Sequence, residues 1–194
     1  MLAAVETIGA LISPFIQSVA SGRVEVYNEF SLQHELGISL RAALPNRKVQ
    51  FERNVTFFFQ SKATFTKKEI DISVFSPDRR ELVYAIELKF PRNGQYPEQM
   101  FSFCKDVSFA EELRVAGFRA AGLVIFADDS LFYSGPTDGI YGFFRGERPI
   151  HGRIQKPTGS KDAESLIRGH YVARWNPIVA SLKYVVIEVL SINS

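Results

Sequence analysis

The sequence of 194 residues predicts an α/β fold in which a mixed central sheet is flanked by helices. A helical segment is followed by three segments of strand character, a second helix and a strongly apolar strand. Hydrophobic residues make up 46% of the chain and charged residues 23%, as is typical of folded domains. We find no repeat or linker, so we expect one domain over residues 1–194.

The N-terminal segment 1–22 has the spacing of an amphipathic helix or helix pair. Its apolar positions are Leu2, Val5, Ile8, Ile12, Phe15 and Val19. A basic start is missing, and Glu6 and Pro14 interrupt the apolar run, so the segment does not fit a signal peptide. Because no apolar stretch approaches the length of a membrane span, we expect no membrane contact. The single Cys104 excludes an internal disulfide, which agrees with a cytoplasmic location.

The middle of the chain contains six further elements, two helices and four strands. A helical pattern runs from Val24 to Leu44, and a second one, beginning with Pro and ending with Gly, covers 97–117. Strand-forming residues dominate 48–60, 68–76, 81–90 and 119–129, and the last of these reads as a strand buried on both faces. Residues 130–161 are rich in Gly, Pro, aromatic and basic residues, and strands are predicted at 170–175 and 182–190.

Two carboxylates interrupt the strands of the predicted hairpin. Because strand side chains alternate in direction, Asp71 points away from the apolar face of its strand, as do Glu87 and Lys89 on the next. If 77–81 form the turn, Ser76 pairs with Leu82 and the same register places Asp71 directly opposite Glu87.

Carboxylates this close repel each other unless a proton or a cation lies between them. Mg²⁺ prefers oxygen ligands and commonly takes one or two carboxylates from a protein. A metal held by Asp71 and Glu87 would activate water or polarise a phosphoryl oxygen, and Lys89 would stabilise charge that develops beside it.

Asp71, fifteen residues, and then Glu87-Leu88-Lys89 resemble the signature of the PD-(D/E)XK nuclease superfamily. The resemblance implies a restriction-endonuclease-like αβββαβ core over about 24–129, with an N-terminal helix and a β-rich extension over 130–194. It also implies that Asp71, Glu87 and the Leu88 carbonyl bind Mg²⁺ or Mn²⁺ and that Lys89 is catalytic. Many members have Pro before the aspartate, where this chain has Ile70.

The family often adds a glutamate from its first helix and a glutamine from the helix after the motif. Glu29 lies about 20° from Leu36 on the inward stripe (Leu32, Leu36, Leu40 and Ala43), whereas Glu35 lies about 100° away, so Glu29 is the better candidate. Gln99 is the corresponding glutamine. The alternatives are a helix-terminal charge stabilised by the dipole for Glu29 and a solvent-facing side chain for Gln99.

Basic and aromatic residues alternate in the C-terminal extension. Tyr141, Phe143 and Phe144 could stack on bases beside arginines that bind phosphate, and a solvated loop with buried aromatics is the alternative. The candidate nucleic-acid contacts are Arg92, Arg145, Arg148, Arg153 and Lys156. His34, His151 and His170 are scattered and lack the spacing of a zinc pair.

These features predict a Mg²⁺- or Mn²⁺-dependent nuclease that hydrolyses phosphodiester bonds, with DNA as the expected partner. The alternatives are an inactive nucleic-acid-binding module of the same fold and an unrelated protein in which the charged residues form a structural ion network. A net charge of only +2 does not decide between them. The choice of DNA or RNA, the type of cleavage and a possible homodimer stay open.

Overall fold

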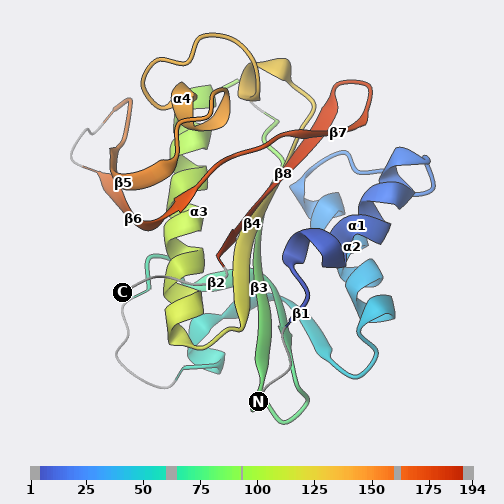
Figure 1. Ribbon diagram of the computed structural model, residues 1–194. Helices are drawn as coiled ribbons and strands as arrows, with labels where there is room; N and C mark the ends of the chain where they lie inside the picture. Colours follow the sequence, from blue (N-terminus) through green and yellow to red (C-terminus); the bar gives the residue numbers. More distant parts are fainter. Residues whose placement is uncertain (1–4, 60–64, 93, 160–162, 190–194) are drawn as a thin grey trace.

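A computed structural model describes residues 5–59, 65–92, 94–159 and 163–189, and it shows a six-stranded mixed sheet with helices on both faces (Figure 1). The predicted α/β class is thus confirmed. The strand order is β1-β2-β3-β4-β8-β7, in which β3 and β4 run parallel and all other neighbours run antiparallel. The strands are β1 (Lys48–Asn54), β2 (Glu69–Phe75), β3 (Leu82–Lys89), β4 (Ala120–Ala127), β7 (Asn176–Val179) and β8 (Leu182–Val189).

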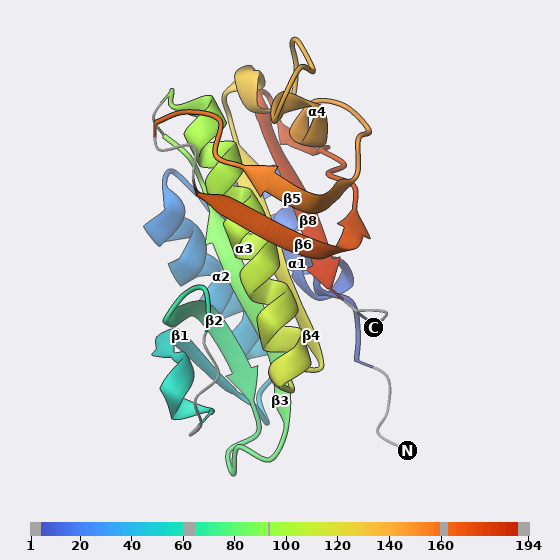
Figure 2. The ribbon, with the colours of Figure 1, turned by 90° about the vertical axis from the view of Figure 1, so that its left-hand side faces the viewer.

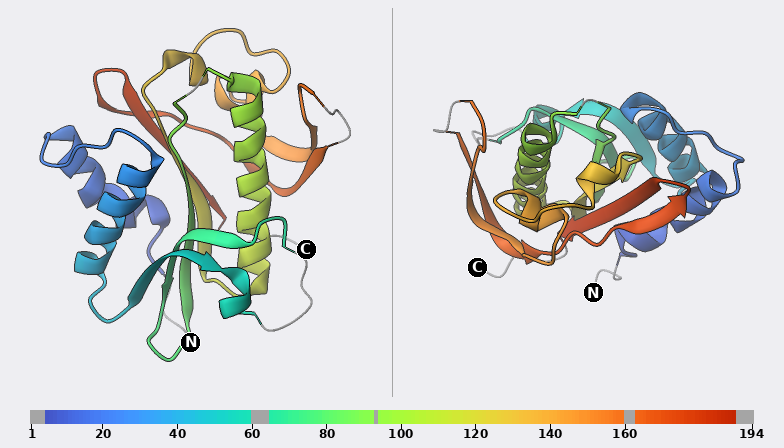
Figure 3. Two further views of the ribbon diagram at one scale, coloured as in Figure 1. Left: turned by 180° about the vertical axis from the view of Figure 1, so that it is seen from behind. Right: turned by 90° about the horizontal axis from the view of Figure 1, so that it is seen from above.

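The helices form a layer on each face of the sheet. α1 (Ile8–Ala20) and α2 (Glu29–Ala43) cover one face, and α3 (Tyr96–Ala116) covers the other (Figure 2). A hairpin of β5 (Ile150–Gln155) and β6 (Glu164–Tyr171) crosses α3, so that α3 lies between the hairpin and the sheet (Figure 3). The short helix α4 (Tyr141–Phe144) precedes β5. No helix in the described segments has the length and apolarity to cross a membrane.

The predicted N-terminal helix is confirmed as α1. Thr7 caps it by accepting a hydrogen bond from the Ala10 N–H at 3.1 Å, and Ile8, Ile12, Phe15 and Val19 are buried. The helix continues through Pro14, which lies on its exposed side. Leu2, the first predicted apolar position, lies outside the described residues.

The helix predicted from Val24 begins later, at Glu29, because Asn28 forms a capping box with Ser31. The Asn28 side chain accepts from the Ser31 N–H at 2.8 Å, and the Ser31 hydroxyl oxygen accepts from the Asn28 N–H at 3.0 Å. The predicted inward stripe is confirmed at Leu32, Leu36 and Leu40, whereas Ala43 is exposed. The cap therefore places Glu29 in the first turn of α2.

Strand ends also differ from the prediction. β1 stops at Asn54, whose side chain accepts from the Thr56 N–H and starts a 3₁₀ turn (Val55–Phe57). The strand predicted at 170–175 ends at Tyr171 and begins earlier, because the buried Glu111 carboxylate of α3 accepts hydrogen bonds from the backbone of β6. The short edge strand β7, which contains Pro177, was not predicted.

The all-apolar strand is confirmed as β4, which is buried along its whole length. Leu123 and Ile125 pack with the α3 side, while Val124 and Phe126 pack with α1 and α2. β3 lies beside it in parallel, so its last residues emerge at the same sheet edge as those of β4. The end of β3 is followed by α3 and carries residues of the candidate site.

Gly122→Ala should destabilise the fold, because an added Cβ would lie 2.6 Å from the Ile187 carbonyl oxygen of β8 and 3.0 Å from Ile8 Cδ1. Displacing a strand backbone in a packed core costs about 1–3 kcal/mol. Gly9→Ala is the matched control, because a Cβ there meets nothing within 4 Å. Replacing a helical glycine by alanine should raise the free energy of unfolding by roughly 0.5–1 kcal/mol. Urea unfolding midpoints measure both effects, and equal midpoints would contradict the tight packing of β4 on β8.

Candidate active site

Asp71 and Glu87 meet between β2 and β3, as the alternation of the hairpin predicts. Ile72 pairs with Ile86, so the next position of the same register places Asp71 opposite Glu87. The Asp71 N–H donates to Glu87 Oε1 at 3.3 Å, and the Leu88 N–H donates to Asp71 Oδ2 at 2.7 Å. Each carboxylate is therefore held by the backbone of the opposite strand.

The predicted pairing at the turn is wrong. A bulge on β3 places Phe75, rather than Ser76, opposite Leu82. From Ile72 to Val74 the register is nevertheless the predicted one, because the bulge compensates for the shift. The error at the turn therefore does not reach Asp71.

Glu87 is completely buried and belongs to an ion network with two residues that the sequence analysis did not identify. The Lys67 ammonium donates to Glu87 Oε2 and, at 3.0 Å, to Asp106 Oδ1. Lys67 precedes β2, and Asp106 lies on the buried face of α3. Two signals were available in the sequence. Lys67 precedes Asp71 by four residues, which is two strand periods, and Asp106 is a charged residue among the mainly apolar buried positions of α3.

Lys89, the last residue of the motif, faces α3. Its ammonium donates to the Leu88 carbonyl oxygen at 2.8 Å and lies 3.4 Å from Glu29 Oε1 and 3.6 Å from Asp106 Oδ2. Only 14% of the side chain is exposed. Asp106 is therefore the residue of α3 that faces both lysines of the site.

Glu29 joins the site from the start of α2. Its Oε2 accepts a hydrogen bond from the Phe90 N–H at 3.1 Å, and its Oε1 faces Lys89. The side chain is 47% exposed. These contacts support the choice of Glu29 over Glu35. Glu29 also lies in the first turn of α2, where the helix dipole stabilises a negative charge, so the alternative role as a helix-terminal charge applies as well.

Burial dominates the electrostatics of the two motif carboxylates. It raises the pKa of Asp71 to about 6, against the opposing effect of Lys67 and Lys89. Complete burial and the neighbouring Asp71 raise the pKa of Glu87 above its usual range. Burial alone would lower the pKa of Lys67 and of Lys89, but the neighbouring carboxylates outweigh burial and raise both pKa values. The carboxylate with the largest effect is Glu87 for Lys67 and Asp106 for Lys89.

A cavity of about 300 Å³ opens beside Asp71 and Leu88 and is bounded on the α2 side by Glu29 and Phe30. Gln33 spans it, because its side-chain amide donates to the Asp71 carbonyl oxygen at 2.9 Å and to Glu52 Oε1 at 2.6 Å. Glu52 has a φ of 47° inside β1, a conformation that side chains rarely adopt, and the pairing of β1 with β2 keeps one register on both sides of it. Phe30 is 74% exposed, so its ring is accessible at the cavity.

The donor set fits one hard divalent cation that keeps part of its water shell. Among the described residues, no group of three or more His, Cys, Asp or Glu side chains is arranged to hold a metal unaided. Four carboxylates nevertheless face only two lysines: Asp71, Glu87, Asp106 and Glu29 against Lys67 and Lys89. Asp106 Oδ2 is buried without a hydrogen-bond partner in the described part of the chain.

The remaining predicted catalytic residue, Gln99, lies in the first turn of α3 and is partly buried. Asp106 follows seven residues later, which places both residues on the same side of the helix, about two turns apart. The direct contact with Lys89 comes from Asp106. A role for Gln99 at the site stays a prediction.

Two of the predicted basic contacts form ion pairs at the surface. Arg92 pairs with Asp128, and Arg153 pairs with Glu164. Both arginines are about half exposed or more. Such exposed pairs contribute little to stability, so each guanidinium remains available to another anion.

Arg145 and Arg148 have internal partners. The Arg145 side chain donates to the carbonyl oxygens of Leu131 and Pro136 and lies 3.8 Å from the centre of the Tyr141 ring. Arg148 lies 3.9 Å from the centre of the Phe143 ring. Of the aromatic residues that the sequence suggested for base stacking, Tyr141 and Phe143 therefore stack on the protein's own arginines, and Phe144 is buried against Phe103.

Comparison of the chain with models of protein families, with curated proteins and with solved structures found no match. The functional assignment therefore depends on the geometry of the site and on the resemblance of its motif.

Asp71→Asn should raise the free energy of unfolding of the metal-free protein at pH 8, by on the order of 1–3 kcal/mol. The folded state holds the Asp71 proton more tightly than the unfolded chain, so ionisation costs stability between about pH 4 and the folded pKa of about 6. The gain should shrink as the pH falls through this window. Asn keeps an acceptor for the Leu88 N–H.

Asp78→Asn is the control of opposite sign, because the Ser76 hydroxyl and the Arg80 N–H lower the pKa of this exposed carboxyl. The variant should be less stable than the wild type at neutral pH, and the difference should vanish in acid. Urea unfolding with a chelator across the pH range measures both variants. A loss of stability for Asp71→Asn at pH 8 would refute the burial argument.

Proposed function

We propose that the protein is a Mg²⁺- or Mn²⁺-dependent nuclease of the PD-(D/E)XK superfamily that cleaves DNA. The main support is the convergence of Asp71, Glu87 and Lys89 at one point between β2 and β3, beside Glu29 of α2. These residues were selected from motif spacing and helix periodicity. An unrelated strand hairpin has no reason to bring them together with a carboxylate from the preceding helix.

In this proposal Asp71, Glu87 and the Leu88 carbonyl hold the cation, and Glu29 supports them directly or through water. When bound, the cation supplies a Lewis acid for the phosphate and lowers the pKa of a bound water. Lys89 stabilises negative charge that develops on the phosphate or orients the attacking water. Asp106 holds Lys89 in position, and the exposed Phe30 ring offers a surface for a base.

A structural ion network is the main alternative, and the buried Asp106 Oδ2 argues against it, because this oxygen accepts no hydrogen bond in the described part of the chain and has only the Lys89 ammonium, 3.6 Å away, as an ion-pair partner. A buried network is stabilising only when each member is satisfied. Here the carboxylates outnumber the lysines, and burial raises the pKa of both motif carboxylates. Groups tuned in this way are typical of functional sites.

The second alternative, an inactive nucleic-acid-binding module, would be expected to lack part of the motif, and here the motif is complete. A cleavage assay on plasmid, single-stranded DNA and RNA, with and without Mg²⁺ or Mn²⁺, tests the proposal. We expect metal-dependent cleavage of DNA that Asp71→Asn abolishes. Wild-type rates in this variant, or no cleavage of any substrate with either metal, would overturn the proposal.

Lys89→Ala should lower the single-turnover cleavage rate by about 10²–10³ while metal binding is retained. Lys89→Arg should restore little of the rate, because a planar guanidinium cannot replace a compact ammonium on the Leu88 carbonyl. Thermal melting with and without Mg²⁺ provides the control. If Lys89→Ala melts far lower yet its folded fraction cleaves normally, Lys89 is a structural counter-ion and not a catalytic residue.

Glu29→Gln should raise the metal concentration needed for half-maximal cleavage by roughly 10–100-fold, as loss of a supporting ligand does. Gln keeps an acceptor for the Phe90 N–H, so the melting temperature should change little. Glu35→Gln is the matched control on the same helix, because Glu35 contacts none of the site residues in the described structure. Equal metal dependence of the two variants would remove Glu29 from the site.

A further inference from the structure

A cavity of about 780 Å³ lies between α4 and the β5–β6 hairpin, away from the carboxylates of the candidate active site. Its charged and titratable lining residues are Arg148, Arg153, Lys156, His151 and His170. None of its lining residues is an aspartate or a glutamate. A concave surface whose charged and titratable groups are all cations or imidazoles favours an anion.

The two histidines lie on neighbouring strands and stack on each other. Their ring centres are 3.6 Å apart and their planes differ by 15°. His151 Nδ1 lies 2.9 Å from the Gly169 carbonyl oxygen, which can only accept, so Nδ1 carries a proton. The opposite nitrogen of this ring is then free for a ligand or for water. The stack thus fixes the orientation of two polar rings at the cavity.

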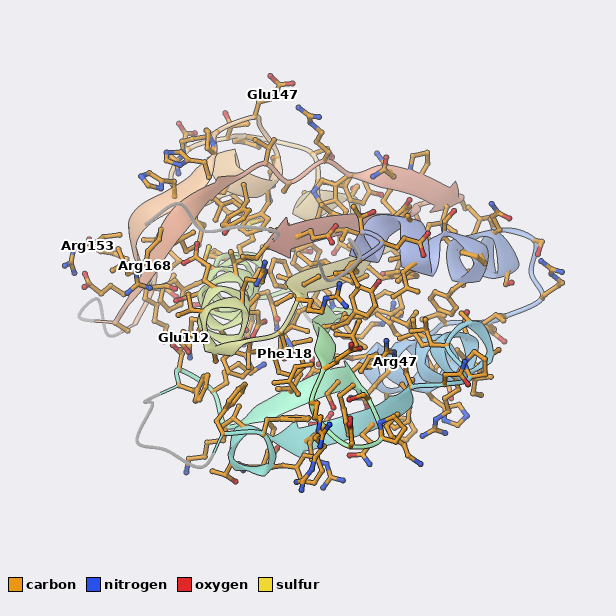
Figure 4. The ribbon with its side chains drawn as sticks, turned by 60° about the horizontal axis from the view of Figure 1, so that its bottom comes forward. Arg47, Glu112, Phe118, Glu147, Arg153 and Arg168 are labelled. Carbon is orange, nitrogen blue, oxygen red and sulfur yellow. The ribbon has the colours of Figure 1, made fainter. Side chains whose placement is uncertain are left out.

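The cations of the cavity differ in how firmly they are held. Arg148 is fixed, because its guanidinium donates to the Gly139 carbonyl oxygen and stacks over Phe143. Arg153 projects outward at the margin of the molecule (Figure 4), where its side chain is 66% exposed beside Glu164. An exposed pair of this kind exchanges readily for a phosphate oxygen, which accepts the guanidinium in the same way.

The cavity adjoins the structural elements that carry the candidate active site. Thr158, which follows the lining residues Lys156 and Pro157, donates to Glu98 in the first turn of α3. That turn follows β3, whose last residue is Lys89, after a short connection. The first turn of α3 therefore lies between the end of the motif strand and the segment that lines the cavity.

We propose that this cavity binds backbone phosphates of a nucleic-acid strand whose scissile bond lies at Asp71 and Glu87, an inference that rests on the proposed nuclease function. Arg153, Lys156 and the imidazoles contact phosphate oxygens, which carry no sequence information. The cavity thus contributes affinity and register, whereas the chemistry stays at the motif. Free inorganic phosphate shares this chemistry and is the competing occupant.

The test measures binding of fluorescent single-stranded DNA to the full chain by anisotropy, with a chelator present and salt varied between about 50 and 200 mM. The double variant Arg153→Ala with Lys156→Ala removes two cations of the cavity. Lys48→Ala with Arg80→Ala removes two exposed cations, the first at the start of β1 and the second in the turn between β2 and β3, a turn that lies at the end of the molecule opposite α4 (Figure 1). Thermal melting verifies that all proteins are folded.

We expect the cavity variant to bind about tenfold more weakly or worse, with a salt dependence shallower by roughly 1.4, since each lost contact with a single strand removes about 0.7. The control variant should bind like the wild type. Equal affinity and slope for the two variants, or no binding by the wild type, would overturn the proposal. Inorganic phosphate that binds the wild type but not the cavity variant, with unchanged DNA affinity, would assign the cavity to free phosphate instead.

Cleavage is measured separately with Mg²⁺. If no substrate is cleaved but DNA binding still depends on the cavity, the nuclease function fails and the binding site stands. If the wild type and the cavity variant cleave equally well at substrate concentrations below saturation, the binding site fails and the nuclease function stands.

Discussion

The complete burial of Glu87 is the constraint on which the candidate site depends. An isolated carboxylate in a protein interior costs far more free energy than a domain can supply, so it must be paired or protonated. The structure meets this requirement with the Lys67 ammonium and the Asp71 N–H, and Lys67 is bound in turn by Asp106. The start of β2, the end of β3 and the middle of α3 must therefore come together for the fold to be stable. One buried group links three elements.

The lysines neutralise the carboxylates of the site only in part, and the remaining negative charge bears on function. Lys67 and Lys89 cannot neutralise Asp71, Glu87 and Asp106 together with Glu29, so the folded protein favours protonated carboxyls at pH values where the unfolded chain is ionised. A protein under selection for stability alone would replace such groups by apolar residues at little cost. In the proposed function a divalent cation neutralises the remaining charge. Metal affinity and instability without metal then share one cause.

The hairpin was predictable because strand alternation has a period of two, and Asp71 faces Glu87 although the turn itself was assigned incorrectly. Glu29 was predictable because helix periodicity survives an error in where α2 begins. Lys67 and Asp106 were missed for another reason. Lys67 binds both Glu87 and Asp106, so their contacts join segments far apart in the chain, and no local period relates a loop before β2 to the buried face of α3.

The basic extension shows the same limit more clearly. The sequence identifies its arginines but cannot say which of them are already bound. Arg145 donates hydrogen bonds to carbonyl oxygens and stacks on an aromatic ring. Arg153 instead projects from the surface and pairs with a carboxylate that a phosphate can replace. His151 and His170 looked unrelated, and only the pairing of β5 with β6 stacks them at one cavity. Positive charge along a sequence therefore predicts that an anion is bound, while the tertiary structure decides where.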